Sequence, residues 1–249
     1  MNAPEHDYLL LAHRAVQRWA KFPVQDQPRP LVLTQPVIEA ERGFTSSEAK
    51  DAWFNGRYEW LVEVPEGVRE RAQRSGGPDG RENLGHALRI TDVGRGQHEF
   101  ATDRGTVTLP AHWLRGPSIL GSLWVLDPAV VIWAPDDRDG QSRRFDQGLP
   151  PLVNAAFRPI AVDPDGLSIT VPWSDYPSAR FTRVEIVETA TAVCGVAISA
   201  TDRTRPSMPR LSLGVLHRVP ARLREPLGQR VFVDLLGQAM QVEARSTAS

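Results

Sequence analysis

Short runs of β-branched and aromatic residues fill the last third of the chain, and turn residues separate them. The runs are Leu167–Trp173, Phe181–Glu188, Thr191–Ser199, Leu211–Leu223, Val231–Leu235 and Met240–Val242. Asp163–Gly166 and Leu236–Gln238 have the composition of turns. Strands spaced by about 8–12 residues are typical of antiparallel sandwiches and barrels. The pattern therefore predicts a mainly β protein with an antiparallel β-sandwich or barrel-like C-terminal half.

The first 30 residues have a helical pattern followed by a proline-rich link. Apolar residues recur at helical spacing over residues 4–21 and form one stripe, consisting of Leu9, Ala12, Val16, Trp19 and Ala20. Pro23 ends the pattern, because proline does not continue a helix. An amphipathic helix of this kind packs on its own domain or docks onto another protein chain. We expect the first, and keep a partner chain bound through residues 4–21 as the alternative.

The middle of the chain mixes helical and strand signals. Thr45–Glu48 has the capping-box spacing, which predicts a helix at about residues 46–54. The turn composition of Asp92–Gly96 predicts a hairpin between strands 87–91 and 98–102. A long polar loop at 135–151 divides this part from the C-terminal strands. The predicted organisation is a helix and link at 1–30, a mixed α+β subdomain at 31–150 and a β subdomain at 151–245.

Composition narrows the classes of partner. The 249 residues are 41% hydrophobic and 24% charged, and the 29 basic and 30 acidic residues leave a net charge of -1. Without a positive field, we expect neither nucleic acid nor a membrane surface as a partner. No run of 18 apolar residues predicts a transmembrane helix, and the acidic N-terminus does not have the pattern of a signal peptide. A cytoplasmic location is the resulting expectation.

Four templates for chemistry fail at a required position. Gly94–Gly96 lacks the third glycine of a dinucleotide fingerprint and is interpreted as a turn. The Gly116–Gly121 segment is one residue too long for a nucleophile elbow. Cys194, the one cysteine, has apolar neighbours that favour a buried residue over a reactive thiol. A calcium-loop pattern with Asp137, Asp139 and Asp146 has proline at its first position, so these remain weak metal candidates. No cofactor is predicted.

Three residues are the best catalytic candidates. His98, Asp103 and His112 lie on or between neighbouring predicted strands, where alternate residues share one face. If they converge, they form the acid and base groups of a hydrolase. No spacing between them matches a known catalytic pattern, so a hydrolase remains the alternative and a non-catalytic role is favoured.

Seven tryptophans against three tyrosines suggest a second alternative. Tryptophans that are exposed in a row on a sheet bind sugars, because the indole rings stack on the apolar faces of the sugar rings. Most of these tryptophans are flanked by Leu, Val or Pro, which favours burial in the core instead. A sugar-binding module using exposed tryptophans stays open.

Three segments together resemble a loose set of uncharacterised actinobacterial β-rich proteins. They are Phe100–Gly105 followed by Leu109–Ala111, Trp124–Ala129, and Pro226–Val231, and they include the motifs A-T-D-R-G, L-P and P-L-G-x-R. Many members of that set are predicted lipoproteins or secreted proteins. The resemblance implies an all-β module of structural or binding type and carries no activity. The sequence thus favours a non-catalytic binding or interaction module.

Overall fold

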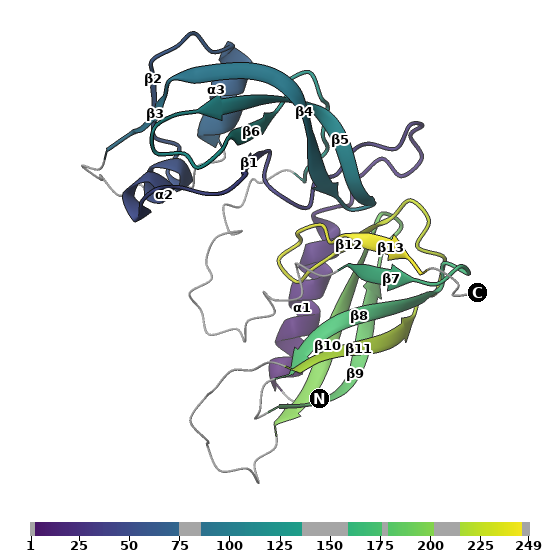
Figure 1. The fold of residues 1–249 in the computed structure, drawn as a ribbon. Coiled ribbons are helices and arrows are strands. Elements are labelled where there is room, and N and C mark those ends of the chain that lie inside the picture. Colours follow the sequence, from purple (N-terminus) through teal and green to yellow (C-terminus); the bar gives the residue numbers. More distant parts are fainter. Residues whose placement is uncertain (1–2, 75–85, 136–158, 176–178, 202–214, 246–249) are drawn as a thin grey trace. The chain divides into compact units, whose positions relative to one another are not determined.

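The computed structural model describes residues 3–74, 86–135, 159–175, 179–201 and 215–245 (Figure 1). Its contacts divide the chain into two compact units. Unit 1 comprises residues 1–34, 102–105 and 133–249, and unit 2 comprises residues 35–101 and 106–132. Strands predominate in both units, so the prediction of a mainly β protein with an N-terminal helix is confirmed.

Unit 1 contains one helix and seven strands among its described residues. They are α1 (Ala3–Gln17), β7 (Ile160–Val162), β8 (Ser168–Asp175), β9 (Ala179–Glu188), β10 (Ala192–Thr201), β11 (Val215–Arg222), β12 (Val231–Val233) and β13 (Val242–Ala244). The strands form a sheet of order β12-β10-β9 and a sheet of order β11-β8-β7-β13. Most neighbours are antiparallel, while β10–β12 and β7–β13 are parallel pairs. Neither sheet closes into a barrel.

The two sheets of unit 1 enclose a hydrophobic core, as in a sandwich. Ile169 and Val171 come from β8, and they pack with Val193 of β10 and Phe232 of β12. Successive residues of a strand point to opposite faces. The neighbours of Val193 and Phe232 therefore point out of this core, toward the opposite face of their sheet.

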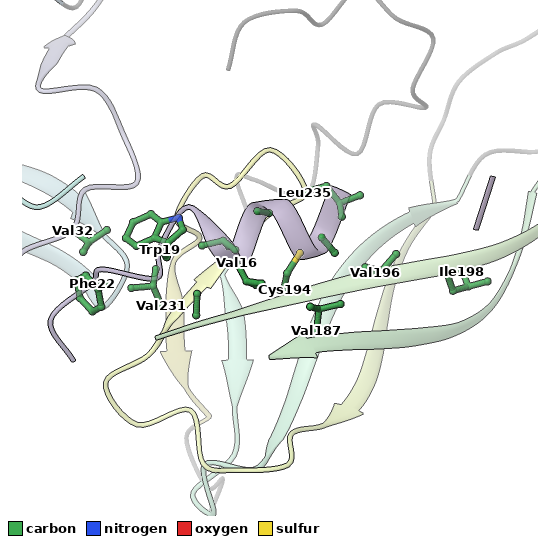
Figure 2. Packing of buried hydrophobic residues seen from close by; sticks show 14 residues of the cluster. Val16, Trp19, Phe22, Val32, Val187, Cys194, Val196, Ile198, Val231 and Leu235 are labelled. Carbon is green, nitrogen blue, oxygen red and sulfur yellow. The ribbon is translucent and has the colours of Figure 1, made fainter. Parts of the chain in front are cut away.

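Helix α1 covers that opposite face. Val16 and Trp19 are buried in one cluster with Cys194 and Val196 of β10, and the Cys194 sulfur lies against the helix (Figure 2). Burial raises the pKa of the Cys194 thiol, which agrees with a buried apolar role. Most of the predicted stripe thus packs onto its own unit, although α1 ends at Gln17 instead of residue 21 and Ala20 is exposed. Binding of a partner chain through residues 4–21 stays a prediction.

Unit 2 contains two helices and six strands in its described part. They are β1 (Ile38–Ala40), α2 (Ser47–Phe54), β2 (Tyr58–Trp60), α3 (Glu66–Arg74), β3 (Leu88–Ile90), β4 (Asp92–Thr102), β5 (Gly105–Arg115) and β6 (Leu123–Leu126). The last residue of β4 and the first of β5 belong to unit 1. The main sheet has the order β1-β6-β5-β4, and β2 and β3 form a parallel pair.

One face of the main sheet carries the core of unit 2. Leu114 and Val125 are fully buried there, with Ala52 of α2 and Val68 of α3 packed in the same cluster. Both helices therefore cover this face. The cross-strand pair Trp113 and Trp124 points to the other side of the sheet, because these residues alternate with the core residues.

Several local predictions are confirmed and two are wrong. A glycine just after a helix is the usual stop signal, and Gly56 follows the predicted helix at 46–54; it has φ of 61° directly after α2 and its cap. Gly166 completes the Asp163–Gly166 turn with φ of 67°. The cap of α2 is Ser46 rather than Thr45, since the Ser46 hydroxyl accepts the bond from the Ala49 amide.

The predicted hairpin turn at Asp92–Gly96 is wrong, because residues 92–102 form the single strand β4. The glycines there make room for tryptophan rings instead of a turn. A Cβ at Gly94 would lie 2.1 Å from a ring carbon of Trp113. The chain reverses later, at Asp103 and Arg104, between β4 and β5.

The domain limits read from the sequence differ from the two units. Residues 1–34 group with the C-terminal strands instead of standing apart, and the change between units falls at residue 132. An apolar stripe does not reveal which sheet it will cover. Among the described residues, the helices are too short or too polar to cross a membrane.

Candidate functional site

Glu39 and His98 meet across the main sheet of unit 2. They come from β1 and β4, the two outer strands, which are separated by β6 and β5. Three strand spacings amount to about 14 Å in a flat sheet, yet Glu39 Oε2 lies 3.2 Å from His98 Nε2. Because side chains stand roughly perpendicular to a sheet, the sheet curls toward the side that carries this pair.

Aromatic rings fix the position of His98. Its imidazole lies parallel to the Trp124 indole, with centroids 4.9 Å apart and an angle of 4° between the planes. The edge of Phe100 packs against the same imidazole at 5.2 Å. We call the side of the sheet with Glu39, His98, Trp113 and Trp124 the tryptophan face. The face opposite the helices thus holds a half-buried histidine in one orientation.

Trp113 has two close neighbours at its ring. The backbone of Gly94 lies so near that a Cβ there would overlap the indole. The Arg115 guanidinium lies over the ring with its carbon 4.5 Å from the centroid, and Arg115 Nε donates to Ser122 Oγ at 3.1 Å. Trp113 therefore does not present a free surface for stacking.

Glu39 keeps one carboxylate oxygen without a partner. Oε1 is buried, and no donor in the part of the chain that the structure describes lies within hydrogen-bond distance. A buried polar atom left unsatisfied costs about 1–3 kcal/mol. Because Oε2 is engaged by His98, Oε1 is the oxygen of this carboxylate that is left to accept a further hydrogen bond.

His112 belongs to the opposite face of the same sheet. Its register partner is Val125, a core residue, whereas Trp113 pairs with Trp124. His112 Nε2 lies 3.3 Å from Asp127 Oδ2, and both side chains are buried. Arg95 donates a hydrogen bond to Asp127 at 2.7 Å, and the backbone N–H of Ala129 donates a second one. Both hydrogen bonds lower the pKa of Asp127. This second pair is enclosed and fixed by its neighbours.

Asp103 is held by arginines of unit 1. Arg29 donates to both carboxylate oxygens, with 3.1 Å to Oδ1, and Arg104 Nε lies 3.7 Å from Oδ2. Asp103 is 1% exposed, and burial raises the pKa of its carboxyl while the Arg29 hydrogen bond opposes that rise. The carboxylate is thus engaged in a structural ion pair.

The same arginines reach the Pro226–Val231 segment. Arg104 donates to the carbonyl oxygens of Gly228 and Arg230, and Arg29 donates to that of Gln229. Two of the segments noted in the sequence, Phe100–Gly105 and Pro226–Val231, therefore contact each other at their turns. Arg29 and Arg104 thus connect two loops of unit 1 through hydrogen bonds.

The three catalytic candidates consequently have three different partners. His98 pairs with Glu39 on the tryptophan face, and His112 pairs with Asp127 on the core face of the same sheet. Asp103 pairs with Arg29 in unit 1. Among the described residues, no hydroxyl or thiol is hydrogen-bonded to His98 or His112. The geometry does not bring the two histidines to one substrate.

The other candidates are resolved only in part. Asp137, Asp139 and Asp146 lie outside the described residues. Within the described ranges, no three histidine, cysteine or acidic side chains gather in a way that would hold a metal ion. Six tryptophan side chains are described, at positions 19, 53, 60, 113, 124 and 133, and each is buried or partly buried. The proposed row of exposed indoles is not seen among them.

Glu39 was missed at the level of sequence. It stands between Ile38 and Ala40, an alternation that would have marked a short strand with one polar face. The local pattern does not indicate that this strand lies two strands away from β5, or that its polar face meets His98. Only the order of the strands in the sheet places Glu39 near His98.

No protein-family model, no curated protein and no solved structure matches this chain. The resemblance to actinobacterial β-rich proteins therefore rests on its quoted segments and remains a proposal.

Proposed function

We propose that this chain is a non-catalytic binding protein and that its ligand contacts Glu39, His98 and Trp124 on the tryptophan face. The observation that carries the proposal is the buried Glu39 Oε1, which has no donor among the described residues. The ligand supplies an N–H or O–H group to this oxygen. It also places an apolar part beside the stacked imidazole and indole.

The surroundings of His98 favour binding over hydrolysis. A nucleophilic hydrolase holds its histidine within hydrogen-bond reach of a serine, threonine or cysteine. Here the described contacts of His98 are one carboxylate and two aromatic rings. These contacts restrict the imidazole, which suits a surface that recognises a ligand in one orientation.

Two kinds of ligand carry donors of the required type. Saccharides offer hydroxyl groups and apolar ring faces, and primary amines offer a cationic N–H group that a carboxylate attracts. Arg115 lies over the Trp113 ring and His98 lies flat on the Trp124 ring. A saccharide ligand would therefore bind here through a hydroxyl group at Glu39 and not by stacking on a bare indole.

An NMR screen tests the proposal. Saccharides and primary amines are added separately while the Trp124 indole N–H and the His98 imidazole signals are followed. We expect at least one compound to shift both signals saturably and to leave the Trp133 indole of unit 1 unchanged.

Two results would refute the proposal. One is a set of compounds that shift only signals remote from the tryptophan face. The other is turnover of an ester, phosphate or glycoside that disappears in His98→Ala, because that would make His98 catalytic.

A further inference from the structure

Two side chains of unit 2 contact the Trp60 ring on the side of β2 that faces the core. Tyr58 and Trp60 are two residues apart on β2, so they share a face, and their rings stack at 5.0 Å with an angle of 25°. Arg69 comes from α3, and its guanidinium carbon lies 5.7 Å from the Trp60 ring centroid. The three residues form a small cluster of two rings and one cation.

Each member of this cluster has a buried polar atom without a partner. The atoms are Tyr58 Oη, Trp60 Nε1 and Arg69 Nε, and none finds a hydrogen bond within the described ranges. An indole nitrogen and a guanidinium nitrogen can only donate. Burial raises the pKa of Tyr58, so its hydroxyl keeps the proton and can donate as well.

The nearest carboxylate in the sequence does not serve these donors. Glu59 lies between Tyr58 and Trp60 and therefore points to the opposite face of β2. There it forms an ion pair with Arg89 of β3 at 3.2 Å, and both side chains are more than half exposed. The donors of Tyr58, Trp60 and Arg69 therefore have no acceptor in Glu59, because Glu59 pairs with Arg89.

We propose that Tyr58, Trp60 and Arg69 form a binding site for an oxyanion, the carboxylate or phosphate group of a ligand. Such a group offers several acceptor oxygens, and a guanidinium matches it in charge and geometry. The unsatisfied atoms of this site are hydrogen-bond donors, whereas the unsatisfied atom of the tryptophan face is an acceptor. The two inferences stand on separate residues.

The Arg69 side chain also bears on how an anion reaches these buried donors. Its side chain is long and half-buried, whereas α3 itself is held by the fully buried Val68 and Ala72. The proposal therefore requires the Arg69 side chain to rotate away from the Trp60 ring, which it can do without moving the helix. An anion that binds beside Trp60 is then contacted by the same guanidinium.

The Trp60 indole N–H signal reports binding directly. The full-length protein, labelled with ¹⁵N, is titrated with acetate in one series and inorganic phosphate in another. Chloride keeps the ionic strength constant, and Trp60→Phe assigns the signal. We expect a saturable downfield shift with at least one anion. A response to acetate alone identifies a carboxylate site, and a response to phosphate alone identifies a phosphate site.

Two charge-matched variants separate a site from general attraction. Arg69→Gln and Arg89→Gln each remove one positive charge, but only Arg69 belongs to the cluster. We expect at least tenfold weaker binding in Arg69→Gln and wild-type binding in Arg89→Gln. Equal weakening in both variants would overturn the proposal, as would the absence of any saturable shift in the wild type.

Tyr58→Phe gives a readout that does not depend on Arg69. It removes an unpaired buried hydroxyl and keeps the ring, so the free protein should be at least as stable as the wild type. Its affinity for the anion should fall. A stable Tyr58→Phe protein that binds the anion like the wild type contradicts the site, even if Arg69→Gln fails to fold.

Discussion

His98 stacks flat on Trp124, with 4.9 Å between the ring centroids and 4° between the ring planes. The two residues come from β4 and β6, so this contact bridges the intervening strand β5. It fixes the imidazole beside Glu39 and makes the tryptophan face a preorganised surface. The proposed binding role depends on this arrangement.

Replacing Trp124 by leucine should release the imidazole. The ring current of a parallel indole shifts the His98 ring protons upfield, and leucine has no ring current. We expect the His98 Cε1 proton of Trp124→Leu to move toward its position in unfolded protein, as measured by NMR at fixed pH. An unchanged signal would show that the two rings do not stack in solution.

Gly94→Ala should disturb the tryptophan face more than Gly96→Ala. A Cβ at Gly94 would lie 2.1 Å from the Trp113 ring, whereas one at Gly96 would lie 3.2 Å from the Trp124 ring. Overpacking of the first kind costs about 1–3 kcal/mol. Urea unfolding followed by tryptophan fluorescence measures both variants. Equal stability of the two would contradict the close approach of Trp113 to Gly94.

Arg230 should not tolerate replacement by lysine. Its guanidinium pairs with Glu188 at 2.9 Å and also donates to the carbonyl oxygens of Glu225 and Pro226. Lysine keeps the charge but not the planar set of donors, so hydrogen bonds to these carbonyl oxygens are lost and we expect the free energy of unfolding to fall by about 1.5–3 kcal/mol. Chemical denaturation measures that loss.

Arg183 provides the control for that experiment. It forms an exposed ion pair with Glu185 at 2.7 Å, and exposed pairs contribute about 0–1 kcal/mol. Arg183→Lys should therefore change the stability little. If the two lysine variants are equally stable, the loop at residues 225–230 is not organised by Arg230.

Arg95→Gln should raise the pKa of Asp127. The Arg95 hydrogen bond is the main cause of its lowered pKa. In the wild type, the unfolded chain therefore binds more protons between the lowered value and the ordinary one of about 3.9. The contribution of Asp127 to stability is present above that window and is lost as the pH falls through it.

Carboxyl ¹³C NMR titration measures the pKa of Asp127 in both proteins. The acid-side loss of stability should also be shallower in Arg95→Gln, because the folded and unfolded values move closer together. The same pKa in wild type and variant would mean that Arg95 does not contact Asp127.

Local chemistry made part of this fold predictable. The Asp163–Gly166 turn, the glycine that ends α2 and the apolar stripe of α1 follow from short stretches of sequence, and the structure has all three. Each depends on residues that are close together in the chain. Composition and strand spacing were enough for the mainly β class.

Contacts between distant residues were not predictable in this way. Gly94 and Gly96 have turn composition, and only the Trp113 and Trp124 rings lying over them explain why they belong to a strand. His98 was named from its strand position, but its partner Glu39 lies 59 residues away on the other outer strand. Sheet order, which decides such pairs, leaves no local signal.

The most direct measurement takes the compound that most strongly shifts the NMR signals of Trp124 and His98. Its affinity is determined for three proteins. Calorimetry compares wild type, Glu39→Gln and Glu59→Gln, where Glu59 is exposed and paired with Arg89. We expect Glu39→Gln to bind at least tenfold more weakly, a loss of about 1.4 kcal/mol in binding free energy, and Glu59→Gln to bind like the wild type. Wild-type affinity in a folded Glu39→Gln protein would contradict the proposed binding role.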